Sequence, residues 1–200
     1  LGYFSSASFN VLACGFSHFI KNGGNIRMYI NPNLTEDDYA LLKANKNEEF
    51  EERLLESYEE LFNILSKRDE LFFRCLAYLI QQKRIEIRIA VLKEGGIAHE
   101  KFGIFTDTNG NEVVFNGSMN LTASGLTRNI ESIDCICSWN NEENKQRIAT
   151  YHNDFDSVWD GSNKDVIIYE AEDFCQKIVT RYQHEKLDAI VLDETKTIHE

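Results

Sequence analysis

The residues best suited to chemistry form two short polar motifs that stand close together in the sequence. The first holds His99 and Lys101, and the second holds Gly117, Ser118 and Asn120. A histidine can act as a nucleophile or a proton carrier near neutral pH. Lysine, serine and asparagine side chains can donate hydrogen bonds to phosphate oxygens. This combination predicts a site that binds and attacks a phosphate group.

A β-hairpin would bring the two motifs together. Residues 97–106 and 112–117 have the composition of strands, and Asn109-Gly110 between them is the strongest short signal for a hairpin turn. If these two residues form the loop, Lys101 lies opposite Ser118. Side chains alternate along a strand, so one face of the hairpin is predicted to carry the polar set. That set is His99, Lys101, Asn116, Ser118 and Asn120.

The pattern resembles the signature of the phospholipase D-like phosphodiesterases, a His-x-Lys motif followed by an aspartate and a Gly-Ser-x-Asn block. Its matching residues here are His99, Lys101, Asp107, Gly117, Ser118 and Asn120, with Glu131 where these enzymes carry a downstream acid. The resemblance covers roughly residues 1–170. It is similar in particular to nuclease-like domains fused to bacterial DNA helicases and restriction enzymes.

The resemblance implies a role for each catalytic residue. His99 would attack phosphorus and form a phosphohistidine, with no metal or other cofactor. Lys101, Ser118 and Asn120 would hold the non-bridging oxygens as charge develops. Glu131 would accept a hydrogen bond from His99 and fix its tautomer, with a surface strand carboxylate as the alternative interpretation of that residue.

Three further residues are expected to shape the site. Asn116 and Gly117 are predicted to bind substrate together with Ser118, although Asn116 is equally well explained as an ordinary strand residue. Asp107 is predicted to have a structural role. It stands one position later than the spacing usual in the family, and Thr106 holds that position.

A phosphohistidine mechanism needs a second histidine to protonate the leaving oxygen. The chain holds no second copy of the full His-x-Lys to Gly-Ser-x-Asn pattern. Single-motif members of the family solve this with a two-fold homodimer that brings two copies of the histidine together. We therefore expect a homodimer in which two copies of His99 share one site.

Composition predicts one α/β domain, and the resemblance implies a mixed central sheet flanked by helices, the phospholipase D-like fold. The chain has 200 residues, of which 42% are apolar. No apolar run is long enough to span a membrane and no signal peptide is visible, so a cytoplasmic protein is expected. The five cysteines match neither a zinc site nor a disulfide framework, and we predict reduced, mostly buried thiols.

Strands and helices are predicted to alternate in the first half of the chain. The phospholipase D-like domain is assigned to residues 1–170, lacking its first element, and a charged helical linker toward a possible absent domain to 171–200. The predicted strands are 1–5, 25–31, 85–92, 97–106, 112–117, 130–139 and 165–169. The predicted helices are 8–22, 45–84 and 141–160.

The net charge of -12 counts against unaided DNA binding, because proteins hold DNA largely by neutralising its phosphates. A fused or associated helicase domain would supply the DNA binding that this acidic chain lacks. A local basic rim could also do so, and its candidates are Lys21, Arg27, Lys93, Lys101 and Arg128.

Three classes of function remain open at this stage. A metal-independent DNA endonuclease of a bacterial restriction or phage-defence protein fits the resemblance best. A phospholipid phosphodiesterase would need a membrane-facing apolar or basic surface, and no amphipathic basic helix is visible in the sequence. A catalytically idle dimerisation module of a larger nucleic-acid enzyme is disfavoured by the intact motif residues.

Overall fold

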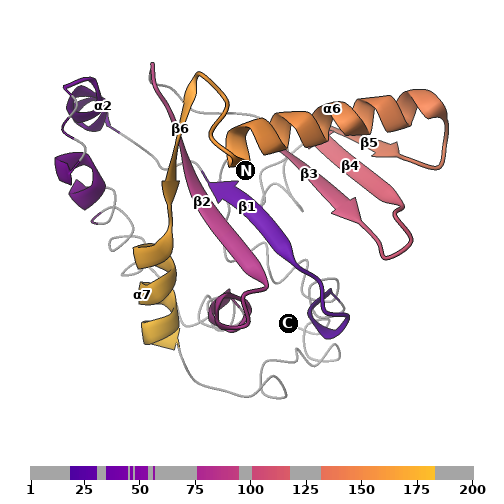
Figure 1. The fold of residues 1–200 in the computed structure, drawn as a ribbon, viewed down its shortest axis with the longest axis horizontal. Coiled ribbons are helices and arrows are strands. Elements are labelled where there is room, and N and C mark those ends of the chain that lie inside the picture. Colours follow the sequence, from indigo (N-terminus) through magenta and orange to yellow (C-terminus); the bar gives the residue numbers. More distant parts are fainter. Residues whose placement is uncertain are drawn as a thin grey trace.

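The computed structural model describes residues 19–30, 35–44, 46, 48–53, 56, 76–94, 101–117 and 132–182. In these ranges the strands form two three-stranded sheets (Figure 1). The first contains β1 (Ile26–Ile30), β2 (Ile85–Leu92) and β6 (Val166–Glu170). The second contains β3 (Lys101–Thr106), β4 (Glu112–Gly117) and β5 (Ile133–Cys137).

The α/β class predicted from the sequence is confirmed. The first sheet is mixed, because β1 runs parallel to β2 while β6 runs antiparallel to it. The second is antiparallel throughout. The one central sheet of the prediction is therefore, in the described part of the chain, two smaller sheets. The predicted strand at 1–5 and most of the predicted helix at 8–22 lie outside the described residues.

One short helix was missed by the sequence analysis. Helix α2 (Glu36–Lys43) begins after Thr35, whose hydroxyl accepts a hydrogen bond from the Asp38 amide while the Asp38 carboxylate accepts one from the Thr35 amide. This reciprocal pair is a capping box. The Thr-x-x-Asp spacing was therefore the signal that could have located the start of the helix.

The main hydrophobic core covers one face of the first sheet. Ile87, Ile89 and Val91 alternate along β2 and are buried against helical residues 48–53 and 76–80, where Phe50 is fully buried. Helix α7 (Glu172–Tyr182) adds Phe174 and Ile178 to the same core. The core therefore extends past the predicted domain boundary at residue 170, into the segment predicted as a linker.

Helix α6 (Glu142–Trp159) connects the two sheets, as Figure 1 shows. Its first half packs Ile148 against Val114 and Ile136 of the second sheet. Its second half lies on the first sheet, where the Phe155 ring is 5.4 Å from that of Tyr29. The Arg88 guanidinium lies over the Trp159 ring at 4.4 Å and also donates to the Trp159 carbonyl. One helix thus fixes how the sheets are placed.

Arg84 closes the end of the helix that precedes β1. Its guanidinium donates to the carbonyls of Ile20 (3.0 Å) and Gly24 (2.8 and 3.0 Å). The last carbonyls of a helix have no partner within the helix, so a cation placed there satisfies them. These bonds also tie the start of β1 to the start of β2.

Replacing Arg84 by methionine is expected to lower the free energy of unfolding by about 2 kcal/mol, since charged hydrogen bonds to half-buried carbonyls are lost. The measurement is urea unfolding followed by circular dichroism. Arg53→Met is the matched control, because the half-exposed Arg53 side chain makes a single long ion pair of 3.5 Å with Asp38 among the described residues and should lose at most about 1 kcal/mol. Equal losses in the two variants would contradict this role of Arg84.

The three described cysteines are free thiols, as predicted, but they are not all buried. Cys135 is exposed on β5, and Cys137 and Cys175 are half-buried. Burial, with a smaller effect of the Glu172 charge, raises the pKa of Cys175 to about 11. The prediction of mostly buried thiols is therefore wrong for Cys135, which lies on a sheet face that no described helix covers.

We expect Cys175 to react far more slowly than Cys135 with a thiol reagent at pH 8. A thiol with a pKa of about 11 is ionised in only about one molecule in 1,000 at that pH, and the thiolate is the reactive form. Peptide mass spectrometry after timed alkylation measures both rates. Labelling of Cys175 as fast as that of Cys135 would contradict the raised pKa of Cys175.

None of the helices in the described part of the chain has the length and apolar content needed to cross a bilayer.

Candidate functional site

Only part of the predicted site lies within the described residues. The backbone of Lys101 is described, and so are Asp107, Asn116 and Gly117. His99, Ser118, Asn120 and Glu131 lie outside the described ranges, as does the Lys101 side chain. The described part of the site is therefore the hairpin that contains position 101, Asp107, Asn116 and Gly117.

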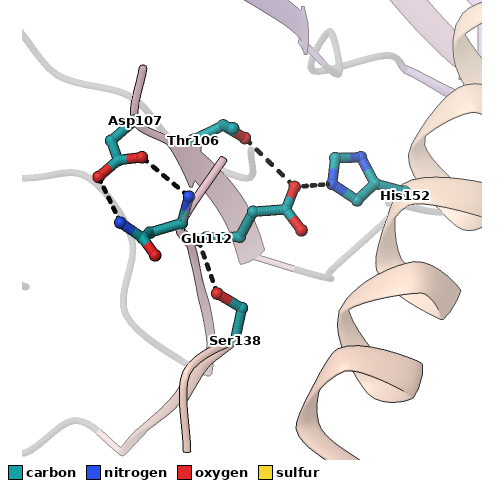
Figure 2. A network of polar contacts seen from close by, with 6 residues as sticks. Thr106, Asp107, Glu112, Ser138 and His152 are labelled. Atoms are coloured by element: carbon teal, nitrogen blue, oxygen red, sulfur yellow. Dashed lines mark hydrogen bonds and ion pairs between the residues drawn. The ribbon is translucent and has the colours of Figure 1, made fainter. Parts of the chain in front are cut away.

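The hairpin turn is built around Asp107. Its Oδ1 accepts hydrogen bonds from the amides of Asn109 and Asn111, both at 2.8 Å, and its Oδ2 accepts one from the Asn111 side chain. Figure 2 shows the Asp107 carboxylate with dashed lines to the side chain and amide of the same neighbouring residue. The bonds from the Asn111 side chain and amide hold the pKa of Asp107 below its usual value. In this turn Asp107 therefore makes structural contacts.

The turn has three loop residues, not the predicted two. The Asp107 amide donates to the Asn111 carbonyl at 2.9 Å and the Gly110 amide to the Asp107 carbonyl at 3.1 Å. Gly110 has a φ of 78°, a left-handed conformation that glycine adopts without strain. A tight turn followed by a left-handed residue is the usual form of a three-residue hairpin loop.

The longer loop shifts the pairing of the strands by one residue. Lys101 pairs with Gly117, and Phe102 pairs with Asn116. The predicted pairing of Lys101 with Ser118 is therefore wrong. Directly opposite residues in an antiparallel pair share a face, so Asn116 lies on the face of Phe102 and not on that of Lys101. The prediction that Asn116 and Lys101 share one face fails for this reason.

Asn116 points toward helix α6. Its Nδ2 donates to the Tyr151 hydroxyl at 2.8 Å, in a half-buried position. The Tyr151 ring packs on Phe102, the residue opposite Asn116, with 5.4 Å between ring centroids. Asn116 thus bonds to the helix, and sequence reasoning found no partner for it because that partner comes from residue 151.

Gly117 is held closely by the neighbouring strand. A Cβ atom added there would lie 2.0 Å from the Ser132 carbonyl oxygen, a distance that real side chains never show. Only glycine therefore fits at the end of β4, next to Ser118. Close packing against Ser132 therefore explains why the first residue of the Gly-Ser-x-Asn block is glycine.

The second face of this sheet is open and carries few charges. Phe105 and Ile133 are 61% and 43% exposed, and Cys135 is exposed beside them. By register these positions share a face with Gly103, Phe115 and position 101. Uncovered aromatic and aliphatic side chains of this kind are unusual on a chain with a net charge of -12.

A second polar cluster lies near the turn, and the sequence analysis did not identify it. Glu112 Oε1 is 2.6 Å from His152 Nε2 and accepts a hydrogen bond from the Thr106 hydroxyl at 3.3 Å. Figure 2 shows the carboxylate between the hairpin and α6. Glu112 pairs with Thr106, at the opposite end of β3 from Lys101. Five residues of strand span about 17 Å, so His152 is remote from the predicted site.

Metal ligands and a basic rim are two further features that a phosphate site could have. Within them, no group of three His, Cys, Asp or Glu side chains could hold a metal ion. Two members of the predicted basic rim have partners elsewhere. Arg27 forms an ion pair with Asp156 at 3.3 Å, and Lys93 donates to the Lys164 carbonyl at 2.6 Å. Neither contact is with the hairpin.

A shallow cavity of about 380 Å³ lies beside the first sheet. Its charged lining residues are of both signs and include Arg88, Lys93, Asp160 and Glu170. Of the predicted site residues that the structure describes, Asp107, Asn116 and Gly117, none lines it. The cavity is therefore separate from the described part of the hairpin.

The sequence matches the family profile described as cardiolipin synthase, phospholipase D-like domain, over residues 20–159. This stretch is more than half of the chain and runs from the end of the helix before β1 to the end of α6. The chain belongs to the phospholipase D-like family. Membership supports an enzyme that acts on phosphodiester bonds. Comparison with curated proteins gives no match.

The first His-x-Lys motif, His99 to Lys101, lies within the matched stretch. The same tripeptide recurs as His184-Glu185-Lys186, after the match ends and outside the described residues. No Gly-Ser-x-Asn block follows this second copy. Within the phospholipase D-like stretch, only His99 stands in the full pattern.

Proposed function

We propose that this protein is a metal-independent DNA phosphodiesterase that works through a phosphohistidine on His99. The observation that carries the proposal is the phospholipase D-like family match across both halves of the motif, in which His99, Lys101, Ser118 and Asn120 are all present. The hairpin adds support, because it pairs Lys101 with Gly117 and so brings the His-x-Lys strand beside the Gly-Ser-x-Asn strand.

The reaction proceeds in two steps, formation of the phosphohistidine and its hydrolysis. A neutral His99 ring nitrogen attacks phosphorus, the bond from phosphorus to the leaving oxygen breaks, and that oxygen takes a proton from a second histidine. Water then attacks the phosphohistidine, loses its proton to the second histidine and frees His99. Lys101, Ser118 and Asn120 stabilise the charge on the non-bridging oxygens in both steps, and Glu131 orients His99.

The second histidine is His99 of another copy of the chain, so the active form is a two-fold homodimer. A net charge of -12 opposes self-association, and a contact surface without acidic side chains reduces that repulsion. The open face with Phe105 and Ile133 has this character and includes position 101 by register. This observation supports a site shared by two protomers.

DNA is the proposed substrate on the likeness to helicase-fused and restriction nucleases. The acidic charge makes unaided DNA binding weak, so a fused or associated helicase domain would deliver the strand in a restriction or phage-defence protein. The chemistry of the histidine does not depend on that delivery. A small diester can therefore report on the site when DNA binds poorly.

The test is hydrolysis of plasmid DNA and of bis(4-nitrophenyl) phosphate in excess EDTA, with phospholipid vesicles as a third substrate and light scattering to measure the mass. The proposal predicts cleavage that EDTA leaves unchanged, from a species with the mass of a dimer. Cleavage abolished by EDTA would overturn the metal-independent mechanism. No hydrolysis of either substrate would favour an idle dimerisation module, and turnover of phospholipid vesicles alone would favour a lipid substrate.

A further inference from the structure

We infer that Tyr151 is a positioning residue for the site, acting through Asn116. The inference rests on the proposed function, because it assigns Tyr151 the task of holding the strand end that leads to Gly117 and Ser118. Tyr151 belongs to α6 and bonds to Asn116, so it acts on the reacting atoms through another residue.

The contact between Tyr151 and Asn116 is well placed for this task. The Asn116 amide group donates to the Tyr151 hydroxyl at 2.8 Å, one residue before Gly117. The ring of the same tyrosine packs on Phe102, one residue after Lys101, with 5.4 Å between centroids. One side chain therefore contacts both motif strands next to their functional ends.

The third strand of the sheet is tied to the same helix at the same end. Asp134 pairs with Asn116 across the β4–β5 ladder, and its carboxylate accepts a hydrogen bond from Arg147 at 2.8 Å. Arg147 precedes Tyr151 by one turn of α6. Phe102, Asn116 and Asp134, which lie side by side across the three strands, are thus all held by α6.

Such anchoring matters because phosphoryl transfer is sensitive to geometry. A displacement of about 1 Å in the groups that hold a substrate can cost about 100-fold in rate. Without the Tyr151 hydroxyl, Asn116 is left with an unpaired amide and the end of β4 loses its only described side-chain bond to the helix. Loss of the hydroxyl therefore loosens the position of the next two residues.

The neighbouring residue on α6 supplies a matched control. His152 bonds to Glu112 from the same helix and the same sheet face, but at the turn end of the hairpin. Tyr151→Phe removes one oxygen and keeps the ring on Phe102. His152→Gln keeps a polar group near Glu112. The two variants thus disturb one helix-to-strand bond each, at opposite ends of β4.

The experiment measures kcat and KM for bis(4-nitrophenyl) phosphate and the amide hydrogen exchange of the hairpin. Tyr151→Phe should lower kcat about 10-fold, change KM less than about twofold, and speed exchange at Gly117 and Ser118. His152→Gln should keep kcat within about twofold and speed exchange at Glu112 instead. Asn116→Ala combined with Tyr151→Phe should be no slower than Tyr151→Phe alone.

These results separate the inference from the proposed function. An active wild-type protein with unchanged kcat in Tyr151→Phe would overturn the inference and leave the proposed function standing. Equal losses of kcat in the two helix variants would show a general effect of stability and would also overturn it. If the wild-type protein hydrolyses no diester, the proposed function fails. Unchanged exchange at Gly117 and Ser118 in Tyr151→Phe overturns the inference in that case too.

Discussion

Replacing His99 by alanine is expected to lower diester hydrolysis by about 1,000-fold or more, the scale of loss seen when a covalent nucleophile is removed. Alanine cannot form the bond to phosphorus, and no other histidine of the chain stands in the full motif. The measurement is single-turnover hydrolysis in excess EDTA. Circular dichroism and light scattering should match those of the wild-type protein.

His184→Ala is the control for this loss. His184 stands in the same His-Glu-Lys tripeptide as His99, but it lacks the Gly-Ser-x-Asn block and lies beyond the phospholipase D-like match. Its removal should leave the rate within about twofold of wild type. A large loss in His184→Ala would point to this residue as the second histidine of the mechanism and would contradict a site made from two copies of His99.

Replacing Phe50 by alanine is expected to lower the free energy of unfolding by about 3–5 kcal/mol, the range found for buried phenylalanines. The Phe50 ring is fully buried in the main core and packs on Tyr169 of β6 with 5.5 Å between centroids. Its loss leaves a cavity between the helical segment 48–53 and the first sheet. Urea unfolding followed by circular dichroism measures the change.

Phe105→Ala is the control for Phe50→Ala, because it removes the same type of side chain from an exposed position. Phe105 is 61% exposed on the open face of the second sheet, so its loss should cost about 0.5 kcal/mol in the monomer. A loss of less than about 1 kcal/mol in Phe50→Ala would show that the core of the first sheet is not packed as described. That result would also weaken the account of how α7 joins the domain.

Strands and helices with strong periodic signals were predictable from the sequence. The predicted strands at 85–92 and 112–117 match β2 and β4, and the predicted helix at 141–160 matches α6 to within a residue at each end. Alternating burial along β2 and the apolar stripe of α6 are local patterns, so a single sequence carries them. The short helix α2 had only its cap as a signal.

The strand register was not predictable from the Asn-Gly signal alone. That signal correctly located the turn, but the Asp107 carboxylate bonds to two amides and so selects a three-residue loop. The resulting shift of one residue moved Asn116 to the other face of the sheet. Asp107, the aspartate of the motif, therefore sets the pairing register of strands β3 and β4.

Long-range partners account for the other differences. Asn116 bonds to Tyr151, and Glu112 bonds to His152. Arg84 donates to carbonyls at the end of a helix about sixty residues earlier. No local pattern encodes such pairs, because they depend on how α6 crosses the sheets. The motif residues were identified by type and spacing, whereas the side chains that support them required the fold.

Trapping the covalent intermediate tests the central claim most directly. Wild-type protein in excess EDTA is mixed with a labelled DNA strand, quenched under denaturing alkaline conditions that preserve phosphohistidine, and digested for mass spectrometry. The account predicts a phosphate-linked nucleotide on His99, absent from His99→Ala. Hydrolysis that proceeds with no adduct on His99, or with the adduct on another residue, would contradict it.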